Sequence, residues 1–204
     1  MGGKRTMKQA FKNGILALLL SSVAGAAWSE QTLVFVRHGE KPDNNSGQLT
    51  CKGFNRALAL PEVLISRFGK PEAIYAAGPK KNKLGSSMRA LTTITPTAIR
   101  LSLPVNIQYH ADDIADLQTA LLDDRFRNAV VYVSWEHHNL VQVVKNIITA
   151  EGGDPQQAAK WPGSDFDSIY VLTIDHDAPA NKIRFEHQTE GLKNVADTCP
   201  TGMK

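Results

Sequence analysis

Short apolar segments typical of strands alternate along this chain with longer segments that have the apolar period of helices. A strand is predicted over 32–38 and another over 128–135, each followed by a helical segment. The chain ends differently, with two strands over 168–175 and 182–191 around a turn-like stretch. This alternation predicts one α/β domain, a three-layer sandwich with a mixed, mostly parallel central sheet and helices on both faces.

The first 29 residues have the pattern of a secretory signal peptide and not of a folded element. A basic stretch precedes the apolar segment 14–28, which is too short to span a membrane with ordinary flanks. Small residues offer two cleavage frames, Ala24-Gly25-Ala26 and Ala27-Trp28-Ser29. We therefore expect a signal peptide over 1–29, a catalytic domain over 30–204, a periplasmic location, and no stable membrane insertion after signal removal. An uncleaved N-terminal anchor remains the alternative.

The basic character of the chain belongs to this leader. Residues 1–29 hold four of the 23 basic residues and none of the 20 acidic ones, so the remainder carries a net charge of −1. A domain with this balance has no overall electrostatic attraction for nucleic acid. Nucleic acid is therefore not expected as a partner.

Two cysteines, Cys51 and Cys199, lie in the expected mature chain. Export would place them in an oxidising compartment, where disulfides persist. An even count permits one bridge, and two separate thiols are the alternative.

Strongly polar residues stand where the predicted strands end. Arg37 and His38 close the strand 32–38, and His137 follows the strand 128–135. Arg89 lies in the first turns of the helix that follows a strand over 73–78. Ligands of such sheets bind beyond the carboxyl ends of the strands, so these side chains are expected at one rim. Guanidinium groups bind phosphate through paired hydrogen bonds, and a neutral imidazole can attack phosphorus.

Four segments in this order resemble the histidine phosphatase superfamily, also called phosphoglycerate mutase-like. "VFVRHGE" is similar to its Arg-His-Gly motif at the end of the first strand, and "LTCKGFNRALAL" to the helix start that follows. "SSMRALTTITPTA" resembles the segment of the second arginine, and "VVYVSWEHHNL" the strand that delivers a second histidine. The resemblance spans most of the expected mature chain and identifies it as a small exported member.

This resemblance implies a phosphomonoesterase that acts on a small phosphorylated substrate, with no cofactor and no metal. It makes His38 the nucleophile that becomes phosphohistidine, with Arg37 and Arg89 as phosphate clamps. His137 is implied to stabilise charge on the transferring group, although His138 is an alternative. Arg56 and Asn44 are implied as further substrate contacts, and the oligomeric state is not indicated.

The general acid is the point at which the chain departs from the family. Larger acid phosphatases of the superfamily place a His-Asp pair after the late strand, where this chain has His137-His138. Smaller members often take the acid from the segment after the second arginine, which here offers Asp112 and Asp113. We assign Asp113, with Asp112 and Glu136 as alternatives.

Three other functions are weighed against this one. A metal hydrolase would need converging ligands, whereas His137 and His138 would point apart if the strand continued through them, and no HxH or HExxH spacing exists. A cysteine phosphatase would need Cys-x5-Arg, and only four residues separate Cys51 from Arg56. The serious alternative is a phosphate-binding protein of the same fold without turnover, which a turnover assay would distinguish.

Two further features of the chain have structural interpretations. "KKNK" at 80–83 is interpreted as a solvated loop, and the alternative is that it attracts an anionic substrate, because it borders the proposed rim. Trp161 and Phe166 are interpreted as core anchors.

Overall fold

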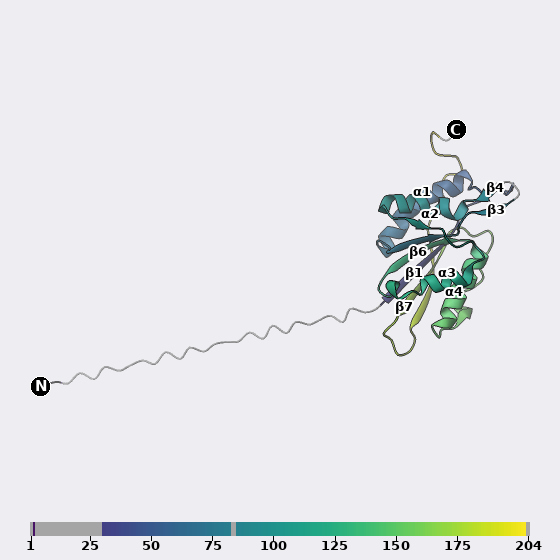
Figure 1. Cartoon of the computed structure of the whole chain (residues 1–204). Helices are drawn as coiled ribbons and strands as arrows, with labels where there is room; N and C mark the ends of the chain where they lie inside the picture. The colour runs from purple at the N-terminus through teal and green to yellow at the C-terminus, as the bar shows by residue number, and fades with distance from the viewer. Residues whose placement is uncertain (1, 3–29, 83–84, 203–204) are drawn as a thin grey trace.

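A computed structural model of the chain describes Gly2 and residues 30–82 and 85–202 (Figure 1). The predicted signal segment therefore lies, apart from Gly2, outside the described residues. Among the residues described, no helix is both long enough and apolar enough to cross a lipid bilayer.

The centre of the molecule is a six-stranded sheet with the strand order β5-β2-β6-β1-β7-β8. Strands β5, β2, β6 and β1 are parallel, and β7 and β8 continue the sheet antiparallel. The sheet is thus mixed and mostly parallel, as predicted. The strands are β1 (Glu30–Arg37), β2 (Ala73–Ala76), β5 (Val105–Asn106), β6 (Val130–Trp135), β7 (Ser168–Asp175) and β8 (Ile183–Thr189).

Four α-helices of the described chain cover the two faces of this sheet. Helices α1 and α2 lie together on one side, and α3 and α4 lie together on the other (Figure 1). This confirms the predicted three-layer sandwich. The helices are α1 (Cys51–Phe68), α2 (Arg89–Leu101), α3 (Ile114–Leu121) and α4 (His137–Ala150), and two 3₁₀ turns, η1 (Asp124–Phe126) and η2 (Pro155–Gln157), join the later elements.

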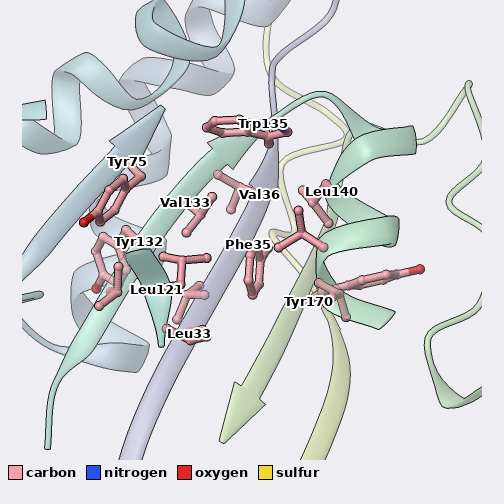
Figure 2. Close-up of a cluster of buried hydrophobic side chains, with 14 of the residues drawn as sticks. Leu33, Phe35, Val36, Tyr75, Leu121, Tyr132, Val133, Trp135, Leu140 and Tyr170 are labelled. Carbon is pink, nitrogen blue, oxygen red and sulfur yellow. The ribbon is translucent and has the colours of Figure 1, made fainter. Parts of the chain in front are cut away.

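The strand β1 lies between β6 and β7 and is covered on both faces. Its residues 33–36 are at most 1% exposed. A strand buried on both faces reads as a continuous apolar run and not as an alternation, which is why "LVFV" was recognisable in the sequence. Figure 2 shows part of this core, with side chains of β1, β6 and β7 beside Leu140 of α4.

A small hairpin was not predicted. Strands β3 (Lys80–Asn82) and β4 (Gly85–Ser87) form a separate two-stranded sheet where a solvated loop and the start of a helix were expected. Three-residue polar strands carry no apolar alternation that would reveal them. Strand β4 ends at Ser87, and α2 begins at Arg89.

A disulfide joins Cys51 and Cys199, whose Cα atoms are 4.5 Å apart, which confirms the bridge. Both cysteines are therefore paired. The bond ties the C-terminal segment to the first residue of α1. Asn55 reinforces the tie, since its side-chain amide donates to the carbonyl oxygens of Ala196 and Thr198 at 2.7 and 2.8 Å.

Candidate active site

The candidate site lies where β1 and β6 end side by side. These strands are parallel neighbours, with Arg37 of β1 in register with Trp135 of β6. The pairing extends one residue further, because the His38 amide donates to the Trp135 carbonyl oxygen at 3.0 Å. The carboxyl ends of both strands therefore deliver their polar residues to one rim, as the sequence predicted.

Two glycines allow the loop after β1 to turn tightly against α1. A Cβ on Gly39 would lie 2.8 Å from the carbonyl oxygen of Gly53, and one on Gly53 would lie 2.5 Å from that of Glu40. Any side chain at either position would force backbone atoms apart. The Gly39 amide also donates to Thr93 Oγ1 of α2 at 2.9 Å. The loop that carries His38 is thus fixed by both helices of one layer.

His38 is buried, with 4% of its surface exposed, and its Nδ1 lies 2.8 Å from the Gly39 carbonyl oxygen. A carbonyl oxygen can only accept, so Nδ1 carries the proton and Nε2 keeps its lone pair. Burial, with a contribution from Arg37 and Arg89, lowers the pKa of His38 to about 4. The imidazole is therefore neutral at neutral pH, which is the nucleophilic form.

Arg37 is buried beside His38 and held by the loop that follows residue 161. Its Nη1 donates to the carbonyl oxygens of Gly163 and Asp165 at 2.9 and 2.6 Å, and its Cζ lies 3.9 Å from the centre of the Phe166 ring. Burial lowers the pKa of Arg37 to about 10, so the guanidinium stays charged at neutral pH. Phe166 thus supports a site residue, although it was expected to be a core anchor.

Arg89 is the first residue of α2 and lines the same cavity as His38. Burial lowers the pKa of its guanidinium, while the charge of Glu136 opposes this shift. The Nε atoms of Arg89 and Arg37 are both buried and have no hydrogen-bond partner in the described part of the protein. These donors can bind an anion.

His137 and Glu136 come from the junction of β6 and α4. Glu136 is the N-cap of α4, and its Oε2 accepts the amides of His138 and Asn139 at 3.0 and 3.1 Å. Its Oε1 lies 2.6 Å from His137 Nδ1, which is buried and has no hydrogen-bond partner in the described part of the protein. Burial, followed by the charge of Arg37, lowers the pKa of His137. Burial raises the pKa of Glu136, but the two amides and His137 outweigh it and lower the pKa overall.

The two adjacent histidines do not point apart. The strand ends at Trp135 and a helix begins at His137, so the rings of His137 and His138 lie 3.9 Å from centre to centre. Together with Glu136 they offer metal-ligand atoms within 4.8 Å of one another. The positive charges of Arg37 and Arg89 and the N-terminus of α4 oppose a divalent cation there.

The cavity has a volume of about 240 Å³, and its lining includes His38, Arg89 and Glu136. Lys80 of β3 also lines it and pairs with the exposed Asp112 at 2.6 Å. "KKNK" was interpreted first as a solvated loop and only as an alternative as a stretch that attracts an anionic substrate; the place of Lys80 in the lining agrees with that alternative. The remaining lining residues are Ala77, Gly78, Ser87, Ala90 and Ala111.

Arg37 and His137 adjoin His38 and Glu136 in the chain but are not among the residues that line this cavity, and neither is Asp113. It stands at the N-cap position of α3, and its Oδ2 accepts the His110 amide at 2.8 Å. Among the described residues, the carboxylate that lines this cavity is that of Glu136.

The two further substrate contacts implied by the resemblance also lie outside the cavity lining. Arg56 is 2% exposed, and its guanidinium donates to the carboxylates of Glu40, Asp167 and Glu190. All of its nitrogens are used, so its contacts join three segments of the chain. Asn44 is exposed and accepts the Ser46 amide at 3.0 Å within its own loop.

A larger cavity, of about 440 Å³, lies elsewhere, between β2, β5 and η1. In the described part of the chain, its lining contains a single cation, Arg125, and no histidine. The chemistry that the residues offer is therefore concentrated in the smaller cavity.

No protein-family model matches the sequence, and no curated protein sequence matches it. Solved structures do share its fold. A mycobacterial glucosyl-3-phosphoglycerate phosphatase is 13% identical and superposes with a TM-score of 0.55 over 78% of this chain and 97% of its own. The protein histidine phosphatase SixA in complex with tungstate is 17% identical, with a TM-score of 0.52 over 78% and 97%. A phosphoglycerate mutase of Plasmodium falciparum is 12% identical, with a TM-score of 0.51 over 77% and 89%. The chain thus has the phosphoglycerate mutase-like fold.

Proposed function

We propose that this protein is an exported phosphomonoesterase that works through a phosphohistidine on His38. The observation that carries the proposal is a neutral, buried imidazole beside two charged guanidinium groups at the carboxyl end of β1. The shared fold supports it, since two of the structures described above are phosphatases. Mutase activity is less well supported, because an exported enzyme has little access to glycolytic intermediates.

In the first step, the lone pair of His38 Nε2 attacks the phosphorus and the bond to the leaving oxygen breaks. Arg37 and Arg89 bind the phosphoryl oxygens, and their charge stabilises the transition state. The leaving oxygen takes a proton from an acid. In the second step, water attacks the phosphohistidine, its proton passes to the conjugate base, and phosphate and free His38 result.

Glu136 supports the role of this acid better than Asp113 does, because it lines the cavity. Its pKa is lowered in the free protein, which by itself favours the ionised form. A phosphate dianion bound beside it would raise that pKa, since like charges disfavour each other. Glu136 could thus take up a proton with the substrate and deliver it to the leaving group.

Export is proposed from two independent features. The first is the signal-like pattern of residues 1–29. The second is the disulfide between Cys51 and Cys199, because such bonds persist in oxidising compartments.

The proposal is tested by a rapid-quench search for an acid-labile, base-stable phosphoenzyme. We expect it in the wild type during turnover of a phosphomonoester and not in His38→Ala. Turnover that survives His38→Ala would show that this histidine is not the nucleophile. A wild type that binds phosphate and turns over no ester would favour a phosphate-binding protein of this fold.

A further inference from the structure

An apolar groove runs between α1 and α2 on the outer surface of the molecule. It has a volume of about 520 Å³ and is lined by Phe54 and Leu58 of α1 and by Met88, Leu91 and Ile99 along α2. Leu58 is 48% exposed and Ile99 71% exposed. The described residues include three large apolar side chains with such exposure, and two of them lie in this groove.

The groove is a second apolar face of α2. Residues 88, 91, 95 and 99 recur at helical spacing on the side that meets α1. A neighbouring side of α2, with Ala90, Ile94 and Ala98, is already buried in the core. Leu91 also packs against the core, whereas Ile99 is 71% exposed and is not accounted for by core burial. Contiguous exposed apolar surfaces on soluble proteins are often binding sites.

The position of the groove relates it to the candidate active site. Met88 lines the groove, whereas its neighbours Ser87 and Arg89 line the phosphate cavity. From Met88 the groove follows α2 to Ile99 near its C-terminus, a length of about 16 Å at the helical rise. A ligand with its anionic end on Arg89 could place an extended apolar chain along this path.

The charges also fit an amphiphile with an anionic head. The cavity at one end offers the cations Arg89 and Lys80. The charged residue of the groove lining is Arg100, which pairs with Glu62 at 2.9 Å toward the far end of α2. No acidic residue lines the groove among the described residues, so nothing there repels an anionic ligand.

We propose that the groove holds the hydrocarbon chain of the substrate, which is a phosphorylated amphiphile with one linear apolar chain. This inference rests on the proposed function, because it takes the cavity of His38 and Arg89 as the phosphate site. It names the substrate class that the catalytic residues alone leave open.

The test compares n-alkyl phosphates from ethyl to decyl, all below the concentrations at which they form micelles. Buried methylenes contribute enough that kcat/KM should rise about twofold to fourfold for each one that enters the groove. The double variant Leu58→Ser/Ile99→Ser should lower kcat/KM for decyl phosphate at least about tenfold and leave ethyl phosphate unchanged. Ile107→Ser is the matched control, because Ile107 is 40% exposed and lies outside the groove lining.

The groove can also be tested independently of turnover, by calorimetric titration with ethylphosphonate and decylphosphonate, which are not hydrolysed. Tighter binding of decylphosphonate that is lost in the double variant supports the inference even if no ester is turned over. Equal affinities would overturn it, whether or not the protein is a phosphatase. Chain-length dependence that survives the double variant would also overturn it. A double variant that changes only the sedimentation of the protein would overturn it as well, since the groove would then bind a second copy of this chain.

Discussion

At the scale of single residues, the proposed role of His38 differs from that of Arg37 and Arg89. Substitutions of His38 and of the arginines should therefore have different effects on binding and turnover. In the proposed mechanism, the imidazole of His38 forms the bond to phosphorus, while the guanidinium groups bind charge that is present before and during the reaction. Loss of His38 should leave anion binding largely intact, and loss of an arginine should not.

Arg89→Ala is predicted to weaken binding of vanadate and also to lower turnover by about 10²–10³, the usual cost of one preorganised donor. His38→Ala should abolish turnover and keep most of the affinity for phosphate. Vanadate inhibition and phosphate titration measure both effects. Arg100→Ala is the matched control, because Arg100 lies on the same helix and pairs on the surface with Glu62. Equal loss of phosphate affinity in His38→Ala and Arg89→Ala would contradict this division of roles.

The general acid leads to a second prediction at this scale. An acid contributes most when the leaving group is poor, so Glu136→Gln should slow alkyl phosphates far more than aryl phosphates with good leaving groups. Asp113→Asn should slow both by the same small factor, because Asp113 does not line the cavity. Steady-state rates for a series of leaving groups distinguish the two variants. If Asp113→Asn slowed alkyl phosphates far more than aryl phosphates and Glu136→Gln did not, Asp113 would be the general acid.

The sequence suggested the two arginines and the nucleophilic histidine but not the position of Glu136. The reason is that this position depends on the local backbone structure at the end of β6. Whether Glu136 faces the cavity depends on whether the strand ends before it or runs through it. The helix that begins at His137 makes Glu136 an N-cap, which aims its carboxylate at the helix N-terminus and the cavity. A one-residue shift in such a boundary lies within the usual uncertainty of sequence reasoning.

Elements with strong apolar patterns were predicted well, and elements held by polar contacts were not. The buried strands β1, β6 and β7 appear as apolar runs in the sequence. The hairpin of β3 and β4 is anchored differently, since the Met88 amide beside it donates to the Gly47 carbonyl oxygen at 2.9 Å. The clustering of Arg56 with three carboxylates likewise depends on segments far apart in the sequence, and no local pattern indicates it.

The Arg56 cluster gives a prediction about pH at the scale of elements, because it joins α1 to the loops before β7 and after β8. One guanidinium cannot neutralise Glu40, Asp167 and Glu190 together. Burial, with the charges of Asp167 and Glu40 also contributing, raises the pKa of Glu190 to about 8, against the opposing effect of Arg56. Glu190 therefore keeps its proton in the folded protein at pH values where the unfolded chain has released it.

The free energy of unfolding should accordingly decrease by an amount on the order of 3–5 kcal/mol as the pH rises from the pKa of Glu190 in the unfolded chain to its pKa of about 8 in the folded protein. Glu190→Gln keeps an acceptor for Arg56 and cannot ionise, so its stability relative to the wild type should increase across this range. Urea unfolding at several pH values measures the difference. Glu186→Gln is the control, because the pKa of Glu186 is lowered and its effect falls at more acid pH. A difference between Glu190→Gln and the wild type that is constant with pH would contradict the prediction.

At the scale of the whole molecule, the disulfide and the N-terminal pattern both concern the cellular compartment in which the chain folds. The bond closes a separation of 148 residues and joins the C-terminal segment to α1. Long closed loops gain about 4–5 kcal/mol in the chain-entropy model. A chain that depends on such a bond folds best in an oxidising compartment.

We therefore predict that protein recovered from the cell envelope begins near Ala27 or Glu30 and contains no free thiol. The basic residues, the apolar segment 14–28 and the small residues before each site are what a signal peptidase requires. Intact-mass measurement and thiol counting on denatured, unreduced protein test both statements in one sample. Leu18→Arg is the matched control, since a charge in the apolar segment should block export and leave the full-length chain inside the cell. If the wild-type chain were recovered only at full length from the cytosol with two free thiols, the protein would not be exported, and its substrate would have to be sought among cytosolic phosphates.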